Sequence, residues 1–204
     1  DYRAFWHELG PVVHFANAGR ALPFEHRWLG DNSVTEAYAM LFEYALLAPE
    51  WLTRYTIMRG DRLHAFRRAQ VFAYLAIVRR YAAKLRYEVE LHRAPSLEAG
   101  ASHYVEILTA ATGFRYAPED ALLDLDDGFY SARYLRAWQL EATLRAHLTE
   151  RFDVDWYRNP RAGPAVLDLL AQGQKDDAST LAREALGRPL GFAPLVAACE
   201  AALA

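Results

Sequence analysis

The chain has 204 residues, of which 53% are hydrophobic and 24% are charged, and this length is sufficient for one substantial hydrophobic core. The formal net charge of -3 disfavours nucleic acid and anionic membranes as partners, and no apolar run reaches the ~18 residues of a membrane span. A single cysteine, Cys199, excludes an internal disulfide framework, so we expect a cytoplasmic location with Cys199 buried in a helix.

Helical periodicity dominates the chain, and no segment alternates apolar and polar residues over the length of a strand. Segment 2–17 has helical flanks around a central motif. The next helix is nearly apolar, and Asn32 or Ser33 is placed to cap it. Pro49 then stops this helix, which we expect to be central in the fold.

Longer amphipathic patterns follow. In 61–93, apolar residues recur three to five apart with arginines between them, which predicts a long helix whose charged side faces solvent or another domain. Segment 96–113 predicts a third helix between a serine cap and a glycine stop, and a fourth long helix begins at Asp127 or Gly128. Prolines and glycines break 159–204 into three short helices.

These patterns together predict an all-α fold with little or no sheet. We expect one helical domain over 1–204, with the motif-bearing helices in 1–158 and short C-terminal helices in 159–204. The arginines of the long helix are partly balanced by acidic residues, and no aromatic stacking motif accompanies them. A nucleic-acid interface is therefore disfavoured a second time.

The run His7-Glu8-Leu9-Gly10-Pro11 carries part of a zinc-peptidase motif. In HExxH, two histidines four residues apart lie on one helical face, about 6 Å apart along the axis, so that both reach one tetrahedral zinc. The glutamate between them polarises the metal-bound water. Here His7 and Glu8 are present, whereas Pro11 stands at the place of the second histidine.

The position of Glu36 adds a third candidate group. The run Ser33-Val34-Thr35-Glu36 also fits a capping box, in which the glutamate reaches back to the backbone of the cap, and the spacing alone does not distinguish the two interpretations. His14 shares the helical face of His7 but lies roughly 10 Å further along the axis. We therefore expect His14 to be a packing residue, unless a bend at Pro11 brings it inward as a ligand.

Three parts of the chain together resemble the thimet oligopeptidase and oligoendopeptidase F family of zinc peptidases. They are the HELGP run, the segment 22–43, and the run 126–138, and the matches extend from Phe5 to about Arg151. The resemblance implies a helical catalytic-domain-like bundle of the zincin type that hydrolyses peptide bonds. It further implies zinc as cofactor, His7 and Glu36 as metal ligands, and Glu8 as general base.

The family also stabilises the oxyanion with a histidine and tyrosines that flank a glycine on a later helix. When Gly128 is aligned with that glycine, the histidine's place falls on Asp124 and two of the tyrosine places fall on Phe129 and Arg136. Tyr130 and Tyr134 remain as candidate donors, and Arg133 could supply positive charge. The competing interpretation is that these aromatic residues at helical spacing belong to the core.

Proline at position 11 is the main departure from the family pattern. It removes a nitrogen ligand, and inside a helix it costs about 3 kcal/mol or a kink, because the carbonyl of His7 loses its partner. A helix that begins afresh at Pro11 would avoid this cost. A catalytic zinc needs three protein ligands, so we predict weak or absent zinc binding and negligible hydrolysis.

The alternative function is a non-catalytic helical domain that binds peptides or a partner protein on a degenerate peptidase scaffold. Members of the resembled family are much longer and have an N-terminal helical region that forms the other wall of a substrate channel. The resemblance therefore implies that this chain is a fragment, an excised domain or one half of a split protein. We expect its exposed apolar surface to drive self-association.

Overall fold

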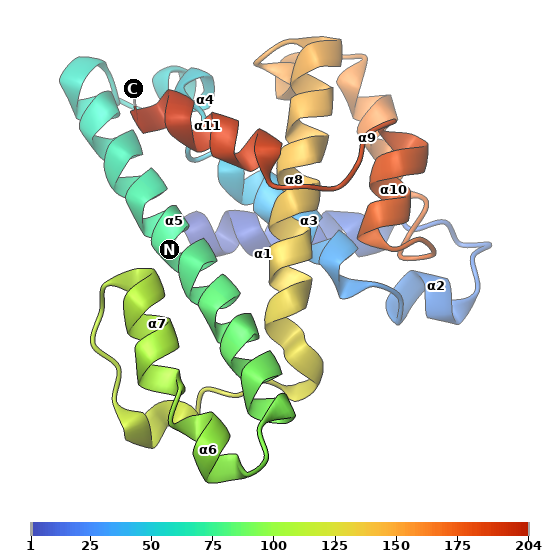
Figure 1. Ribbon diagram of the computed structural model, residues 1–204. Coiled ribbons are helices and arrows are strands. Elements are labelled where there is room, and N and C mark those ends of the chain that lie inside the picture. Colours follow the sequence, from blue (N-terminus) through green and yellow to red (C-terminus); the bar gives the residue numbers. More distant parts are fainter. Residues whose placement is uncertain (1, 204) are drawn as a thin grey trace. The chain divides into compact units, whose positions relative to one another are not determined.

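The computed structural model describes residues 2–203, and these residues form α-helices and short 3-10 helices without any β-strand (Figure 1). The all-α prediction is confirmed. None of the helices in 2–203 is both long enough and apolar enough to cross a membrane. Cys199 is buried and makes no disulfide, as the sequence predicts.

The α-helices succeed one another along the chain with short connections. They are α1 (Tyr2–Asn17), α2 (Phe24–Trp28), α3 (Asn32–Tyr44), α4 (Pro49–Tyr55), α5 (Gly60–Arg93), α6 (Leu97–Ala101), α7 (Tyr104–Thr112), α8 (Tyr130–Phe152), α9 (Ala162–Leu170), α10 (Ala178–Ala185) and α11 (Ala193–Leu203). The 3-10 helices are η1 (Pro118–Ala121), η2 (Asp127–Phe129) and η3 (Trp156–Arg158).

Helix α5 agrees closely with its predicted range, and three short helices follow residue 159, as the sequence predicts. The predicted second helix is shorter than expected, because α3 ends at Tyr44 and not at Pro49. The predicted third helix is two helices, α6 and α7, which a turn around Ser102 separates. Its caps are nevertheless those expected, because Ser96 accepts from the backbone N–H of Ala99 and Gly113 adopts a left-handed conformation with φ of 76°.

The chain divides into two compact units. The first unit contains 1–71 and 136–204, and the second contains 72–135. Helices α5 and α8 each contribute residues to both units. The units divide after residues 71 and 135, whereas the sequence suggests a boundary near residue 158.

The core of the first unit forms around α3 and the second part of α8. In α3, Val34, Ala37 and Tyr38 are at most 1% exposed, and Leu140 and Leu148 of α8 are equally buried. Helix α1 packs along α3 (Figure 1). Burial of a large apolar side chain contributes about 1.5–3 kcal/mol, so this layer supplies much of the unit's stability.

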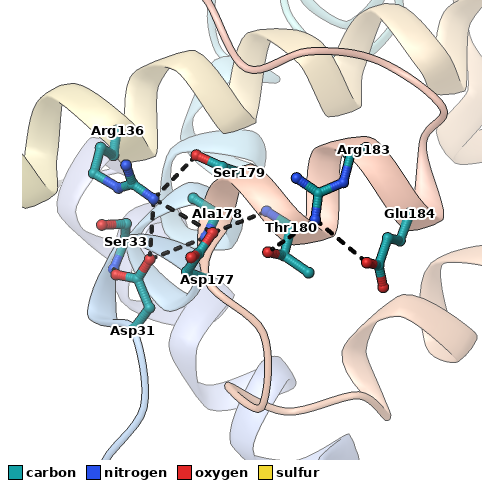
Figure 2. Close-up of polar contacts among 9 residues, drawn as sticks. All are labelled: Asp31, Ser33, Arg136, Asp177, Ala178, Ser179, Thr180, Arg183 and Glu184. Carbon is teal, nitrogen blue, oxygen red and sulfur yellow. Dashed lines mark hydrogen bonds and ion pairs between the residues drawn. The ribbon is translucent and has the colours of Figure 1, made fainter.

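A single aspartate ties the starts of two helices together in the first unit. Asp31 accepts from the backbone N–H of Ser33 at 2.9 Å, which caps α3, and from that of Ala178 at 3.0 Å, at the start of α10. Figure 2 shows Arg136 beside this aspartate and Asp177, at 3.9 Å and 3.5 Å. The N-terminus of α10 is thereby fixed to that of α3.

The core of the second unit forms where α6 and α7 cover the later part of α5. Tyr87 and Tyr104 stack edge to face with ring centroids 5.0 Å apart, and the hydroxyl of Tyr87 donates to the carbonyl of Ala121 at 2.8 Å. Lys84 is almost fully buried and pairs with Asp126 at 2.7 Å. The cation is compensated inside the unit, as burial of a charge requires.

Candidate functional site

The motif helix α1 is held unusually close to α3. A Cβ atom added at Gly10 would lie 2.4 Å from the Cα of Ala39, so only glycine permits this approach of the two backbones. Gly10 lies three residues after His7 and brings this part of α1 against α3. Gly10 of the HELGP run therefore positions His7 beside α3.

Helix α1 is not broken at Pro11. The proline lies inside α1, which continues to Asn17, so the alternative in which a helix begins afresh at Pro11 is wrong. The contact of Gly10 with Ala39 and the burial of His14 hold the helix on both sides of the proline. This packing offsets the lost backbone hydrogen bond of the carbonyl of His7.

The capping-box alternative for Glu36 is also wrong. The N-cap of α3 is Asp31, and Ser33 lies inside the helix with its hydroxyl buried and unpartnered. Asp31 can cap α3 because its side chain is short enough to accept from the backbone N–H two residues later, that of Ser33. The side chain of Glu36 is then turned toward α1.

His7 lies between two carboxylates of α3. Its Nδ1 is 2.9 Å from Oε2 of Glu43, and its Nε2 is 3.5 Å from Oε2 of Glu36. The two glutamates are seven residues apart and so share one face of the helix. Arg3, one turn before His7, also bonds Glu43. The four side chains form a cluster, called the His7 cluster below.

The His7 cluster keeps its histidine charged. The hydrogen bonds that the His7 ring donates to Glu36 and to Glu43, in that order of size, raise the pKa of His7 from 6.5 to about 10, although burial opposes them. Burial also opposes ionisation of Glu43, but the bonds from His7 and Arg3 outweigh it and hold the pKa of Glu43 below its usual range. At neutral pH, two cations and two carboxylates therefore balance one another.

Part of this geometry fits a zinc site. Two tetrahedral ligand atoms at about 2.1 Å from a metal are roughly 3.4 Å apart, close to the 3.5 Å between His7 Nε2 and Glu36 Oε2. Glu43 on Nδ1 occupies the place of the outer carboxylate that orients a zinc-binding histidine. His7 and Glu36, the two metal ligands that the resemblance implies, therefore lie close to one another.

The remaining donors for a zinc site are not assembled. Pro11 has no side-chain donor, and Glu8 is exposed. Across residues 2–203, no group of three or more histidine, cysteine or acidic side chains has the arrangement to hold a metal ion. The residues present supply two ligand positions and therefore do not fit a catalytic zinc, which needs three.

His14 is part of a different, buried network. It is completely buried, and its Nδ1 lies 3.0 Å from the hydroxyl of Thr35, which also accepts from the side-chain amide of Gln174. Gln174 in turn accepts from the backbone N–H of Gly30 at 2.9 Å. Burial lowers the pKa of His14 to about 4, so it is neutral near pH 7 and acts as a structural link between α1 and α3.

The two candidate oxyanion donors belong to the second unit. Tyr130 and Tyr134 stack edge to face with centroids 5.3 Å apart, and Tyr134 also meets Tyr81 at 5.1 Å. Arg133 lies over the ring of Tyr130 at 5.2 Å. The ring contacts of both tyrosines are those of an aromatic cluster on α5 and α8.

Glu43 and Arg3 are the residues of the His7 cluster that sequence reasoning missed. Glu43 lies seven residues after Glu36, and Arg3 lies four residues before His7. Helical spacing of this kind places side chains on one face, so a search for charged partners at four and seven residues would have found both.

The chain was compared with protein-family models, with curated proteins and with solved structures, and none of them matches. The chemistry of the His7 cluster is therefore the basis on which a function is inferred.

Proposed function

We propose that this chain is a zinc-peptidase-like helical domain, of the type found in thimet oligopeptidase and oligoendopeptidase F, that binds peptides or a partner protein without hydrolysing them. The observation that carries this proposal is the His7 ring between Glu36 and Glu43, with 3.5 Å and 2.9 Å to the two carboxylates. This is the arrangement of a metal-binding histidine with one further ligand and one orienting carboxylate, but without the third ligand.

A proton takes the place that a metal would have in such a cluster. Metal binding requires a neutral imidazole, and the pKa of His7, raised to about 10 by the two carboxylates, favours the protonated ring at pH 7. Zinc would have to displace this proton and would find two ligands instead of three. Both effects oppose zinc binding at neutral pH.

The rest of the catalytic machinery is equally incomplete. Glu8, the expected general base, is exposed on α1. A general base contributes to rate only when it is held within hydrogen-bond reach of the proton that it removes. Hydrolysis by this site is therefore not expected.

The exposed side of α1 supports a binding role. Tyr2, Phe5 and Val12 are 77%, 60% and 63% exposed, and their spacing places them on one face of the helix, away from the face that carries His7. Large apolar side chains gathered on a surface are typical of sites that bind another chain. A peptide or a partner helix is the ligand that fits such a face.

The test is the zinc content of the full chain after incubation with zinc and extensive dialysis, measured beside the cleavage of quenched fluorescent peptides. We expect no retained zinc and no cleavage in the wild type. Pro11→His would place an imidazole one turn after His7 and should gain about one zinc per chain, and adding Glu36→Gln to this variant should abolish the gain. Stoichiometric zinc and peptide cleavage in the wild type would overturn the proposal.

A further inference from the structure

A second site lies in the first unit, apart from the His7 cluster. A cavity of about 730 Å³ lies between α1, α3, α4, α8, α9 and η3, and none of the residues of the His7 cluster lines it. Cavities of about 300–1,000 Å³ are the size that binds small organic molecules. The chemistry of the wall then decides which class of molecule fits.

Aromatic side chains form much of the wall, and ring contacts join them into two groups. Trp6 and Trp51 meet edge to face with centroids 5.8 Å apart, and Tyr55 lies 5.3 Å from Trp51. In the second group, Trp156 meets Tyr157 at 6.0 Å. The face of an aromatic ring carries partial negative charge and attracts a cation within about 6 Å of its centroid. Such a wall therefore suits an organic cation.

One cation of the protein already uses the wall in this way. The guanidinium of Arg145 lies over the ring of Tyr44 at 3.6 Å from its centroid, and both residues line the cavity. The same guanidinium bonds the buried carboxylate of Glu141 at 2.7 Å. Glu141 is not a residue of the wall, so the charge of Arg145 is compensated from outside the cavity.

Glu50, the other charged residue of the wall, has no such partner. Within residues 2–203, its carboxylate accepts no hydrogen bond and forms no ion pair, and Arg54, one turn later on α4, is exposed. Burial and then Asp155 raise the pKa of Tyr157, and Glu50 adds to this rise, so its charge acts on the aromatic wall. An uncompensated carboxylate beside aromatic rings favours a cation and repels an anion.

We propose that this cavity binds a small organic cation with an alkylated ammonium group, such as a trimethylammonium compound. The methyl groups fit the apolar wall, the aromatic rings attract the diffuse positive charge, and the carboxylate of Glu50 balances it. A trimethylammonium group has no N–H donor, so it requires no set of acceptors in the wall. This inference does not depend on the peptidase-like proposal, because it involves none of the residues of the His7 cluster.

The experiment is an NMR titration of the isotope-labelled full chain with three ligands of similar shape. Choline carries a trimethylammonium group. Neohexyl alcohol is its uncharged isostere, with carbon in place of nitrogen, and the anion of tert-butylacetic acid has the opposite charge. We expect choline to bind about tenfold more tightly than neohexyl alcohol and the anion to be the weakest of the three.

The indole N–H signals show where choline binds. Trp6, Trp51 and Trp156 line the cavity, whereas Trp28 and Trp138 do not. Choline should shift the signals of the three cavity tryptophans with one common dissociation constant. The signals of the other two tryptophans should stay in place.

Glu50→Gln removes the charge of the wall and keeps the shape of the side chain. It should lower the affinity for choline about threefold to fivefold and leave that for neohexyl alcohol unchanged, which separates charge from packing. Glu25→Gln is the matched control, because Glu25 is also the second residue of a short helix in the first unit but lies outside the cavity. It should change neither affinity. Far-UV circular dichroism shows that each variant is folded.

Incorporation of fluorotryptophan tests the rings in the same way. Fluorine withdraws negative charge from the face of the ring and changes its shape only slightly. The affinity for choline should therefore fall about twofold to threefold, while that for neohexyl alcohol is kept.

Five results would overturn the inference. They are the absence of a saturable shift with choline, equal affinities for choline and neohexyl alcohol, tightest binding of the anion, unchanged choline binding by Glu50→Gln, and unchanged choline binding after fluorination. Tightest binding of the anion would show that Arg145 sets the charge of the cavity despite its bond to Glu141. Cosedimentation with phosphatidylcholine vesicles without any response to free choline would assign the ammonium group to a lipid and likewise contradict a small-molecule ligand.

Discussion

The charged state of His7 makes the protein lose stability as the pH rises. The pKa of His7 is 6.5 in the unfolded chain and about 10 in the folded one. Between these values the folded state holds a proton that the unfolded state has lost, so the free energy of unfolding decreases with pH. The contribution of His7 is complete below pH 6.5 and disappears as the pH approaches 10.

The size of this loss of stability follows from the shift in the pKa of His7. A rise from 6.5 to about 10 corresponds to at most about 5 kcal/mol, at ~1.4 kcal/mol for each pKa unit. The side chain is 26% exposed, and solvent screens its ion pairs. We therefore expect a loss of about 2–3 kcal/mol between neutral and alkaline pH.

The assay is urea denaturation of the wild type and of His7→Gln, followed by circular dichroism at several pH values between 6.5 and 10. The difference between the two proteins isolates His7 from the other groups that titrate in this range. The wild type should be the more stable protein near pH 6.5, and its advantage should shrink by about 2–3 kcal/mol toward pH 10.

A matched control is His103→Gln. His103 also lies near a carboxylate, at 3.4 Å from Glu90, but its side chain is 56% exposed. This substitution should leave the pH dependence of stability almost unchanged. A wild type and a His7→Gln variant with parallel stability curves from neutral to alkaline pH would refute the reasoning about the cluster.

Further predictions concern the packing and capping around the site. Burial lowers the pKa of His14 from 6.5 to about 4, so the free energy of unfolding should decrease as the pH drops from 6.5 to 4. The His14→Gln variant should show a flatter dependence of its unfolding free energy on pH over the same range. Gly10→Ala should cost at least about 2 kcal/mol in urea denaturation, because its Cβ would strike α3, whereas Gly163→Ala in the open first turn of α9 should be neutral or stabilising. Asp31→Ala should lower the free energy of unfolding by about 2 kcal/mol, because it removes hydrogen bonds to the starts of α3 and α10. Asp177 caps only α10, so Asp177→Ala should cost less, and equal losses for the two variants would contradict this account.

The strongly periodic parts of the fold could be predicted from the sequence. The pattern of 61–93 predicts α5 almost to the residue, because sustained helical spacing is a signal that local turns do not imitate. Pro49 shows where such reasoning is incomplete. It was interpreted as the end of the second helix, but α3 ends at Tyr44, and Pro49 is instead the first residue of α4, a position that proline favours.

The candidate site was predictable to a lesser extent. The approach of His7 to Glu36 follows from the family resemblance, and the structure brings these residues together. The role of Glu43 was missed because it depends on which face α3 turns toward α1, and tertiary packing decides this. The continuity of α1 through Pro11 likewise depends on tertiary packing. From the sequence, only the cost of a proline inside a helix can be seen, whereas the packing of Gly10 and His14 that offsets this cost becomes visible in the structure.

The central claim is that a proton, and not zinc, occupies the ring of His7 between its two carboxylates. NMR spectroscopy of the ring nitrogens of selectively labelled histidine tests it most directly, near pH 8 with and without added zinc. We predict that both nitrogens of His7 carry protons, in accordance with a pKa of about 10, and that their signals do not change when zinc is added. A neutral ring whose Nε2 signal shifts with one equivalent of zinc would contradict this claim.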